Sequence, residues 1–226
     1  MINNKSKIKN IIAIILSVII LALYLKVLIF GEAHYVEGFL GIPLAFLISA
    51  LFLDIKNSKA FITYALLLNS IADVFLVLTR THQEVGVSIF ILAQICYMIY
   101  TLMLDKKLWV KLVNISSRVI ISVVAVVVLK SLFNLELLEM LSVIYITNSC
   151  ITCLFLGVHI KTKLLMFIGF ILFILCDIVV GLTWGGAEIL NLSGAFIDLL
   201  YKFDFAFLFY VPGIYLISLS SIKKTE

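Results

Sequence analysis

The stretch ALLLNSIADVFLVL, residues 65–78, decides how the rest of the chain is interpreted. It belongs to a run long and apolar enough to cross a membrane, yet it carries the carboxylate of Asp73. An intramembrane aspartate is costly, so it normally faces a bundle interior or a wet cavity. A second one, Asp177, lies in FIGFILFILCDIVVGL, residues 167–182. We therefore interpret Asp73 and Asp177 as the centre of a site inside the membrane.

The composition supports this membrane interpretation. The 226 residues are 64% hydrophobic and 13% charged, with a mean hydropathy of +1.23, well above the apolar content of soluble domains. Polar stretches reach only about ten residues, too few to fold alone, so we expect one integral membrane domain over residues 1–226. The net charge of +4 is spread over short loops, which makes nucleic acid a poor candidate partner.

Hydrophobic runs predict an all-α, polytopic membrane helix bundle with eight transmembrane helices. The expected helices cover residues 11–30, 36–53, 60–78, 85–104, 116–129, 137–157, 163–182 and 193–220. Pro43 falls inside the second helix and predicts a kink there. The last segment is too long for one perpendicular span, so its first two turns, with Asp198, Lys202 and Asp204, are expected to lie at the interface or to tilt.

Loop charges predict the orientation of these helices. Most Lys and Arg residues fall at the N-terminus, in the loops at 54–59, 105–111 (with nearby Arg118) and 159–163, and in the C-terminal tail. The positive-inside rule therefore places both termini in the cytoplasm, and we expect a bacterial plasma membrane. With eight helices, the chain divides into two four-helix halves of the same orientation. Asp73 and Asp177 then each lie about thirteen residues into corresponding helices, roughly 20 Å from the cytoplasmic face.

The sequence indicates neither a metal site nor a cofactor. All four cysteines fall in apolar segments, and the Cys150-x-x-Cys153 pair has no neighbouring acid or His that would favour zinc. The three histidines share no ligand-like spacing. The sequence does not indicate an oligomeric state.

Two carboxylates in one dry cavity cannot both ionise cheaply, so one is expected to stay protonated near neutral pH. An acid and a base side by side can hydrolyse an acid-labile bond without a metal. Polar residues that could complete the cavity are Asn69, Ser70, Gln94, Tyr97, Tyr100, Asn148, Ser149 and Tyr210. The alternative for each is a simple hydrogen bond between helices, and for the aspartates a bond to a backbone carbonyl.

Three motifs carry a resemblance to a known family. They are Asn69-Ser70-x-x-Asp73-Val74-x-Leu76, Gly86-x-x-x-Phe90-x-x-x-Gln94-x-x-Tyr97 and Gly169-x-x-x-Phe173-x-x-x-Asp177, with Tyr210 in the last helix. This pattern resembles the YhhN membrane-protein family, which includes the lysoplasmalogenases. The resemblance implies an eight-helix bundle that hydrolyses the vinyl-ether bond of a lysoplasmalogen to a fatty aldehyde and a glycerophospho-alcohol.

The residues of this chain differ from the family pattern at several positions. Gln94 stands where the family has His, Ala72 where it has Gly, Cys176 where it has Ser, Ile42 where Lys is common, and Ile214 near a usual Gln. The resemblance implies that Asp73 and Asp177 act as acid and base, while Asn69, Gln94, Tyr97, Asn148 and Tyr210 bind a lysophospholipid-like substrate among the membrane lipids.

Two other classes of function stay open on the sequence. A non-enzymatic lipid binder or a proton-coupled carrier would also explain two carboxylates at one depth. An intramembrane aspartyl protease also uses two aspartates, but its G-x-G-D motif is absent here, because Ile174, Leu175 and Cys176 precede Asp177.

Overall fold

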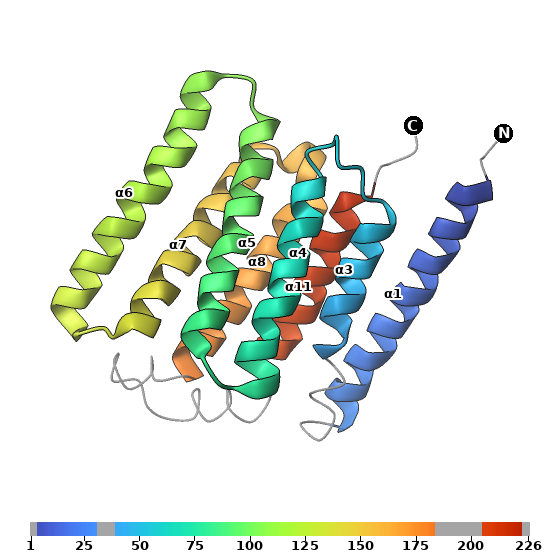
Figure 1. Ribbon diagram of the computed structural model, residues 1–226, viewed down its shortest axis with the longest axis horizontal. Coiled ribbons are helices and arrows are strands. Elements are labelled where there is room, and N and C mark those ends of the chain that lie inside the picture. The colour runs from blue at the N-terminus through green and yellow to red at the C-terminus, as the bar shows by residue number, and fades with distance from the viewer. Residues whose placement is uncertain (1–3, 31–38, 184–204, 223–226) are drawn as a thin grey trace.

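The computed structural model describes residues 4–30, 39–183 and 205–222, and these parts of the chain form an all-helical bundle (Figure 1). Its helices are α1 (Asn4–Phe30), α3 (Gly41–Leu51), α4 (Ala60–Asp73) with its π-helical continuation η2 (Val74–Thr79), α5 (Gln83–Leu104), α6 (Leu108–Phe133), α7 (Leu137–Val158), α8 (Ile160–Gly181) and α11 (Phe205–Ser221). Successive helices run in opposite directions (Figure 1). The predicted all-α bundle is confirmed.

Six of these helices are long and apolar enough to cross a membrane: α1, α4 with η2, α5, α6, α7 and α8. The apolar helices Gly41–Leu51 and Ala206–Ser221 are shorter. Residues 31–38, which precede Gly41–Leu51, and residues 184–204, which precede Ala206–Ser221, lie outside the described residues. The second range includes Asp198, Lys202 and Asp204. Eight complete spans and an interfacial start to the last helix therefore stay predictions.

Two boundaries differ from the sequence-based expectation in a way that matters. Helix α6 begins at Leu108 rather than at residue 116, so Arg118, expected near the start of the helix and its loop, lies ten residues after the start and is buried. Pro43 is the third residue of α3 as described, so it falls in the first turn. A missing N–H removes no intrahelical bond there, because the first four N–H groups of a helix have no partner.

The helix contacts repeat between the two halves of the chain. In the first half α1 packs on α3, α3 on α4, and α4 on α5; in the second half α6 packs on α7, α7 on α8, and α8 on α11. The last helix of each half also packs on the second helix of the other half, α5 on α7 and α11 on α3. This pattern supports the expected correspondence between the helices that carry Asp73 and Asp177, α4 and α8.

Two glycines bring α8 and α11 into close contact. A Cβ atom built on Gly169 would lie 2.8 Å from the carbonyl oxygen of Gly213, and one on Gly213 would lie 3.0 Å from that of Gly169. Small residues allow such close approach of helices in membranes. The contact sets Phe173, one turn after Gly169, against Tyr210 in a stacked arrangement with ring centroids 5.5 Å apart.

Helix α1 is attached at the proline of α11. Pro212 has no N–H to offer the carbonyl of Leu208, four residues earlier in the helix. The Tyr24 hydroxyl of α1 donates to that carbonyl at 3.2 Å, and the Tyr24 ring stacks on Phe207 at 5.7 Å. A neighbouring helix therefore satisfies the backbone group that the proline leaves free.

Candidate active site

Asp73 lies where the regular α-helical part of its span ends. It is the last residue of α4, and the next residue, Val74, begins the π-helical segment η2. Its exposed fraction is 7%, and the Tyr210 hydroxyl of α11 donates to its Oδ2 at 2.8 Å. Short π-helical segments inside α-helices are frequent at functional sites because they change the direction of the side chains that follow. Asp73 and Tyr210 were both predicted from the sequence, and the structure brings them together.

Asp177 lies in α8 and is only partly buried. The Tyr145 hydroxyl of α7 donates to its Oδ2 at 2.9 Å. The sequence interpretation missed Tyr145. A signal for it exists, because Tyr145 precedes the predicted Ser149 by four residues and therefore shares its helix face.

One phenylalanine lies between the two tyrosine–aspartate pairs. The Phe173 ring is fully buried and contacts Tyr210 at 5.5 Å and Tyr145 at 6.2 Å between centroids. Phe173 thus links the two tyrosines, and each tyrosine hydroxyl donates to one of the aspartates. The structure places both pairs around one aromatic cluster, and a site shared by the two carboxyl groups stays a prediction.

Asn69 lies one turn before Asp73 on the same helix. Its Nδ2 donates to the Tyr97 hydroxyl of α5 at 3.3 Å, and Tyr97 packs edge-on against Phe170 with centroids 4.8 Å apart. The Oδ1 atom of Asn69 is buried without a hydrogen-bond partner. A buried acceptor of this kind can receive a hydrogen bond from a ligand or a water molecule.

Gln94 of α5 is buried where α5 packs against α7. Its exposed fraction is 2%, and its Nε2 donates to the Ser149 hydroxyl of α7 at 2.8 Å. Its Oε1 is the second buried side-chain acceptor without a partner among the described residues. Since Ser149 follows Tyr145 by four residues on the same face of α7, Gln94 lies on the Asp177 side of the cluster.

The remaining predicted residues point elsewhere. Asn148 of α7 bonds to α6, where its Nδ2 donates to the Ser122 hydroxyl at 3.3 Å and its oxygen atoms accept from Arg118. The Ser70 hydroxyl donates to the Leu66 carbonyl of its own helix. These two residues make no hydrogen bond to either aspartate.

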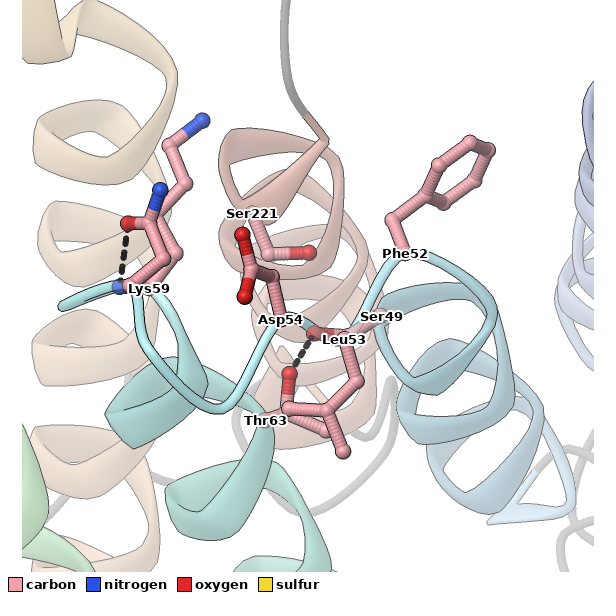
Figure 2. Close-up of a pocket in the computed structure, with 8 residues that line it drawn as sticks. Ser49, Phe52, Leu53, Asp54, Lys59, Thr63 and Ser221 are labelled. Carbon is pink, nitrogen blue, oxygen red and sulfur yellow. Dashed lines mark hydrogen bonds between the residues drawn. The ribbon is translucent and has the colours of Figure 1, made fainter. Parts of the chain in front are cut away.

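Two hollows lie away from the aspartates. One, of about 10 Å³, lies at the α3–α4 turn beside Ser221; Figure 2 shows the Ser49 and Thr63 hydroxyls hydrogen-bonded there, at 2.6 Å. Lys59 beside it donates to the Ile222 carbonyl at 2.9 Å. The other is an apolar groove of about 770 Å³ between α1 and α11. Neither is lined by Asp73 or Asp177.

The described residues hold no group of three or more His, Cys, Asp and Glu side chains that could bind a metal ion. The four cysteines are all free thiols. The chemistry available at the site is therefore that of two carboxyl groups, two tyrosine hydroxyls and the amides of Asn69 and Gln94.

Comparison with known proteins gives one result. The model of the YhhN family matches residues 34–201, well over half of the chain. The match covers both aspartates and both unpaired amides. No curated protein and no solved structure matches the chain.

Proposed function

Because the chain belongs to the YhhN family, which includes the lysoplasmalogenases, we propose that it is a lysoplasmalogenase-type hydrolase. Its substrate is a lysoplasmalogen, and the bond that breaks is the vinyl ether. The products are a fatty aldehyde and a glycerophospho-alcohol. The observation that carries the proposal is the pair of tyrosine-bound carboxyl groups gathered around Phe173.

The proposed reaction begins with a proton transfer from one carboxyl group to the outer carbon of the vinyl ether. This transfer creates an oxocarbenium ion, which the other, ionised carboxylate stabilises. That carboxylate then takes a proton from water as the water oxygen bonds to the cationic carbon. The resulting hemiacetal then collapses: its O–H proton passes to the first carboxylate, its C–O bond to glycerol breaks, and the second carboxyl group gives its proton to the glycerol oxygen, which restores both groups. One water is consumed and no cofactor takes part.

We assign the acid to Asp73 and the base to Asp177. Asp177 is less buried than Asp73 and lies four residues before the end of α8 at Gly181, so we propose that water reaches the site from its side. Asp73 is buried beside Tyr210, where a neutral acid is cheaper to hold than an anion. Asn69, Gln94, Tyr97, Asn148 and Tyr210 are the proposed substrate-binding residues.

A direct assay tests the function. The purified protein is incubated with a lysoplasmalogen, and aldehyde release is measured over time. The matched control substrate is the ester-linked lysophospholipid with the same head group, whose bond is not labile to proton transfer at carbon. We expect aldehyde only from the vinyl ether; a rate equal to that without protein would contradict the proposal.

A second candidate is a lipid-binding or proton-coupled membrane protein of the same family. The observation that favours it is Gln94, an amide that cannot titrate, at the position where the family pattern has His. Such a protein would bind the lysolipid and release no aldehyde. An intramembrane protease is a weaker candidate, since the residues before Asp177 lack the G-x-G-D motif.

The chain is an integral multi-pass membrane protein, and we propose the plasma membrane with both termini in the cytoplasm. The start of α1, the α3–α4 turn and the end of α11 lie at one end of the bundle (Figure 1). Most Lys residues belong to that end. A Thr81→Cys variant without the native cysteines should react with an impermeant thiol reagent only from outside; reaction only from the cytoplasmic side would reverse the orientation.

A further inference from the structure

Arg118 is a cation inside the bundle whose partners are all neutral. It lies in α6 with an exposed fraction of 3%. Its Nε donates to Asn114 Oδ1 at 2.8 Å, and its Nη2 donates to Thr152 Oγ1 at 3.0 Å. Its Nη1 donates to the carbonyl oxygen and to Oδ1 of Asn148, at 3.1 and 3.3 Å.

No carboxylate of the described residues compensates this charge. All hydrogen bonds of its guanidinium go to neutral acceptors, namely the side chains of Asn114, Asn148 and Thr152 and the Asn148 carbonyl. A guanidinium keeps its proton in proteins, so the positive charge persists. An unpaired charge in a membrane interior is costly and indicates a functional role with an anionic partner.

Attachment of α6 to the bundle does not by itself require a charge. The buried residues of α6 are Asn114, Arg118 and Ser122, spaced four apart on one face. Asn114 and Ser122 make their interhelical bonds, to Thr101 and Asn148, with neutral groups. A third neutral residue could complete this polar face at a lower desolvation cost. The charge of Arg118 therefore needs a different reason.

The position of Arg118 suits the head group of a lipid whose reacting bond lies deeper. Arg118 is ten residues into α6, about 15 Å along the helix, whereas Asp73 is thirteen residues into α4, about 20 Å. Both helices begin at the same end of the bundle (Figure 1). Across the bundle the two regions are linked through α7, because Asn148, which accepts from Arg118, lies three residues after Tyr145, the donor to Asp177.

A second, independent feature points to a ligand in this region. Gln94 Oε1 is buried and has no donor, and Gln94 is bonded to Ser149, the residue next to Asn148. The free hydroxyl of a lysolipid glycerol is a donor that would satisfy this atom. The region between Arg118 and the aspartates thus offers one cation and one unpaired acceptor, which match a phosphate and a hydroxyl.

We propose that Arg118 and Asn148 form a subsite for the phosphate group of a lysophospholipid. The identity of the lipid rests on the proposed function. On binding, phosphate oxygens replace the Asn148 oxygens as acceptors for Nη1, and hydrogen bonds between two charged groups are stronger than those they replace. The subsite selects phosphorylated over neutral single-chain lipids.

Binding measurements test the subsite without requiring hydrolysis. The purified full-length protein in detergent is titrated with ester-linked lysophosphatidylethanolamine and with a monoacylglycerol of the same chain. We expect the wild type to bind the phospholipid about ten- to a hundredfold more tightly, the effect of a few charge-assisted hydrogen bonds. Arg118→Gln should abolish that preference and leave monoacylglycerol binding unchanged.

Ser122→Ala is the matched control. It removes a hydrogen bond to Asn148 in the same polar face but keeps the charge, so the preference for phosphate should persist. If Arg118→Gln does not fold, Arg118→Lys decides, because an ammonium cannot reproduce the paired bonds of a guanidinium. Under Arg118→Lys the preference should fall severalfold; an unchanged preference would overturn the subsite.

Other results would also overturn the proposal. One is equal affinity of the wild type for the phospholipid and the monoacylglycerol. Another is an Arg118→Gln variant that keeps the full preference for the phospholipid. A third is a loss of that preference in Ser122→Ala as large as in Arg118→Gln. Displacement by inorganic phosphate at the concentrations at which the lysolipid binds would identify free phosphate, not the lipid, as the ligand. A wild type that prefers phospholipid but releases no aldehyde from lysoplasmalogen would keep this subsite and refute the hydrolase.

Discussion

The two tyrosine–aspartate pairs contain the same side chains in different surroundings. Asp73 is buried, and its partner Tyr210 comes from the other half of the chain; Asp177 is partly exposed, and its partner Tyr145 comes from the preceding helix. The repeated helix contacts place the two carboxylates in corresponding helices. They do not make the surroundings equivalent, and the proposed division into an acid and a base rests on that difference.

The largest expected effect follows from removing either carboxyl group. Asp73→Asn and Asp177→Asn should each lower aldehyde release by about 10²- to 10⁴-fold, because each removes a positioned acid or base. The double variant should lose little more, since the two residues act as one unit. Both variants should still insert and elute as monodisperse protein, because an amide is cheaper to bury than a carboxylate. Robust turnover in either single variant would refute the mechanism.

The next test separates the two pairs. Tyr145→Phe removes a donor to the proposed ionised carboxylate, a bond worth about 1.5–3 kcal/mol, and should lower kcat by about 10- to 100-fold. Tyr210→Phe removes a donor to the proposed neutral acid, worth about 0.5–1.5 kcal/mol, and should cost about 2- to 10-fold. Steady-state kinetics on both variants measure the two losses in kcat. The reverse order of effects would exchange the roles of Asp73 and Asp177.

A helix-contact variant tests whether the pairs depend on the α8–α11 contact. A Cβ at Gly169 would meet the Gly213 carbonyl and Ile217 at 2.8 Å, so Gly169→Ala should destabilise the protein by about 1–3 kcal/mol and move Phe173 from Tyr210. Thermal unfolding in detergent measures the loss. Gly181→Ala is the control, because a Cβ there meets nothing within 4 Å. Equal melting temperatures for both variants would show that the contact is not tight.

The smallest expected effect concerns Gln94. Gln94→His restores the residue of the family pattern and can keep the donor to Ser149 with either ring nitrogen. We expect aldehyde release equal to or above that of the wild type, measured in the same assay as the aspartate variants. A clear decrease would indicate that the amide itself, with its unpaired oxygen, is required on the Asp177 side of the cluster.

Long apolar runs and their charged ends were enough to predict most of this fold. The starts of α4 at Ala60 and of α7 at Leu137 agree with the prediction, because a span is determined locally by hydrophobic length. The predicted helix boundaries were wrong where polar residues lie inside a helix. Helix α6 begins at Leu108, not at residue 116, and so includes Lys111; packing against α7 makes its polar face, with Arg118, compatible with a buried helix.

The sequence by itself determined a membrane bundle with two intramembrane aspartates and the family to which the chain belongs, because composition, hydropathy and motif spacing are properties of the chain alone. Only the tertiary structure decided which groups each aspartate meets. Tyr145 reaches Asp177, Tyr210 reaches Asp73, and Arg118 lies among neutral acceptors, not beside a loop. The physical reason is that Tyr145 lies 32 residues from Asp177 and Tyr210 lies 137 residues from Asp73, so helix packing determines their approach.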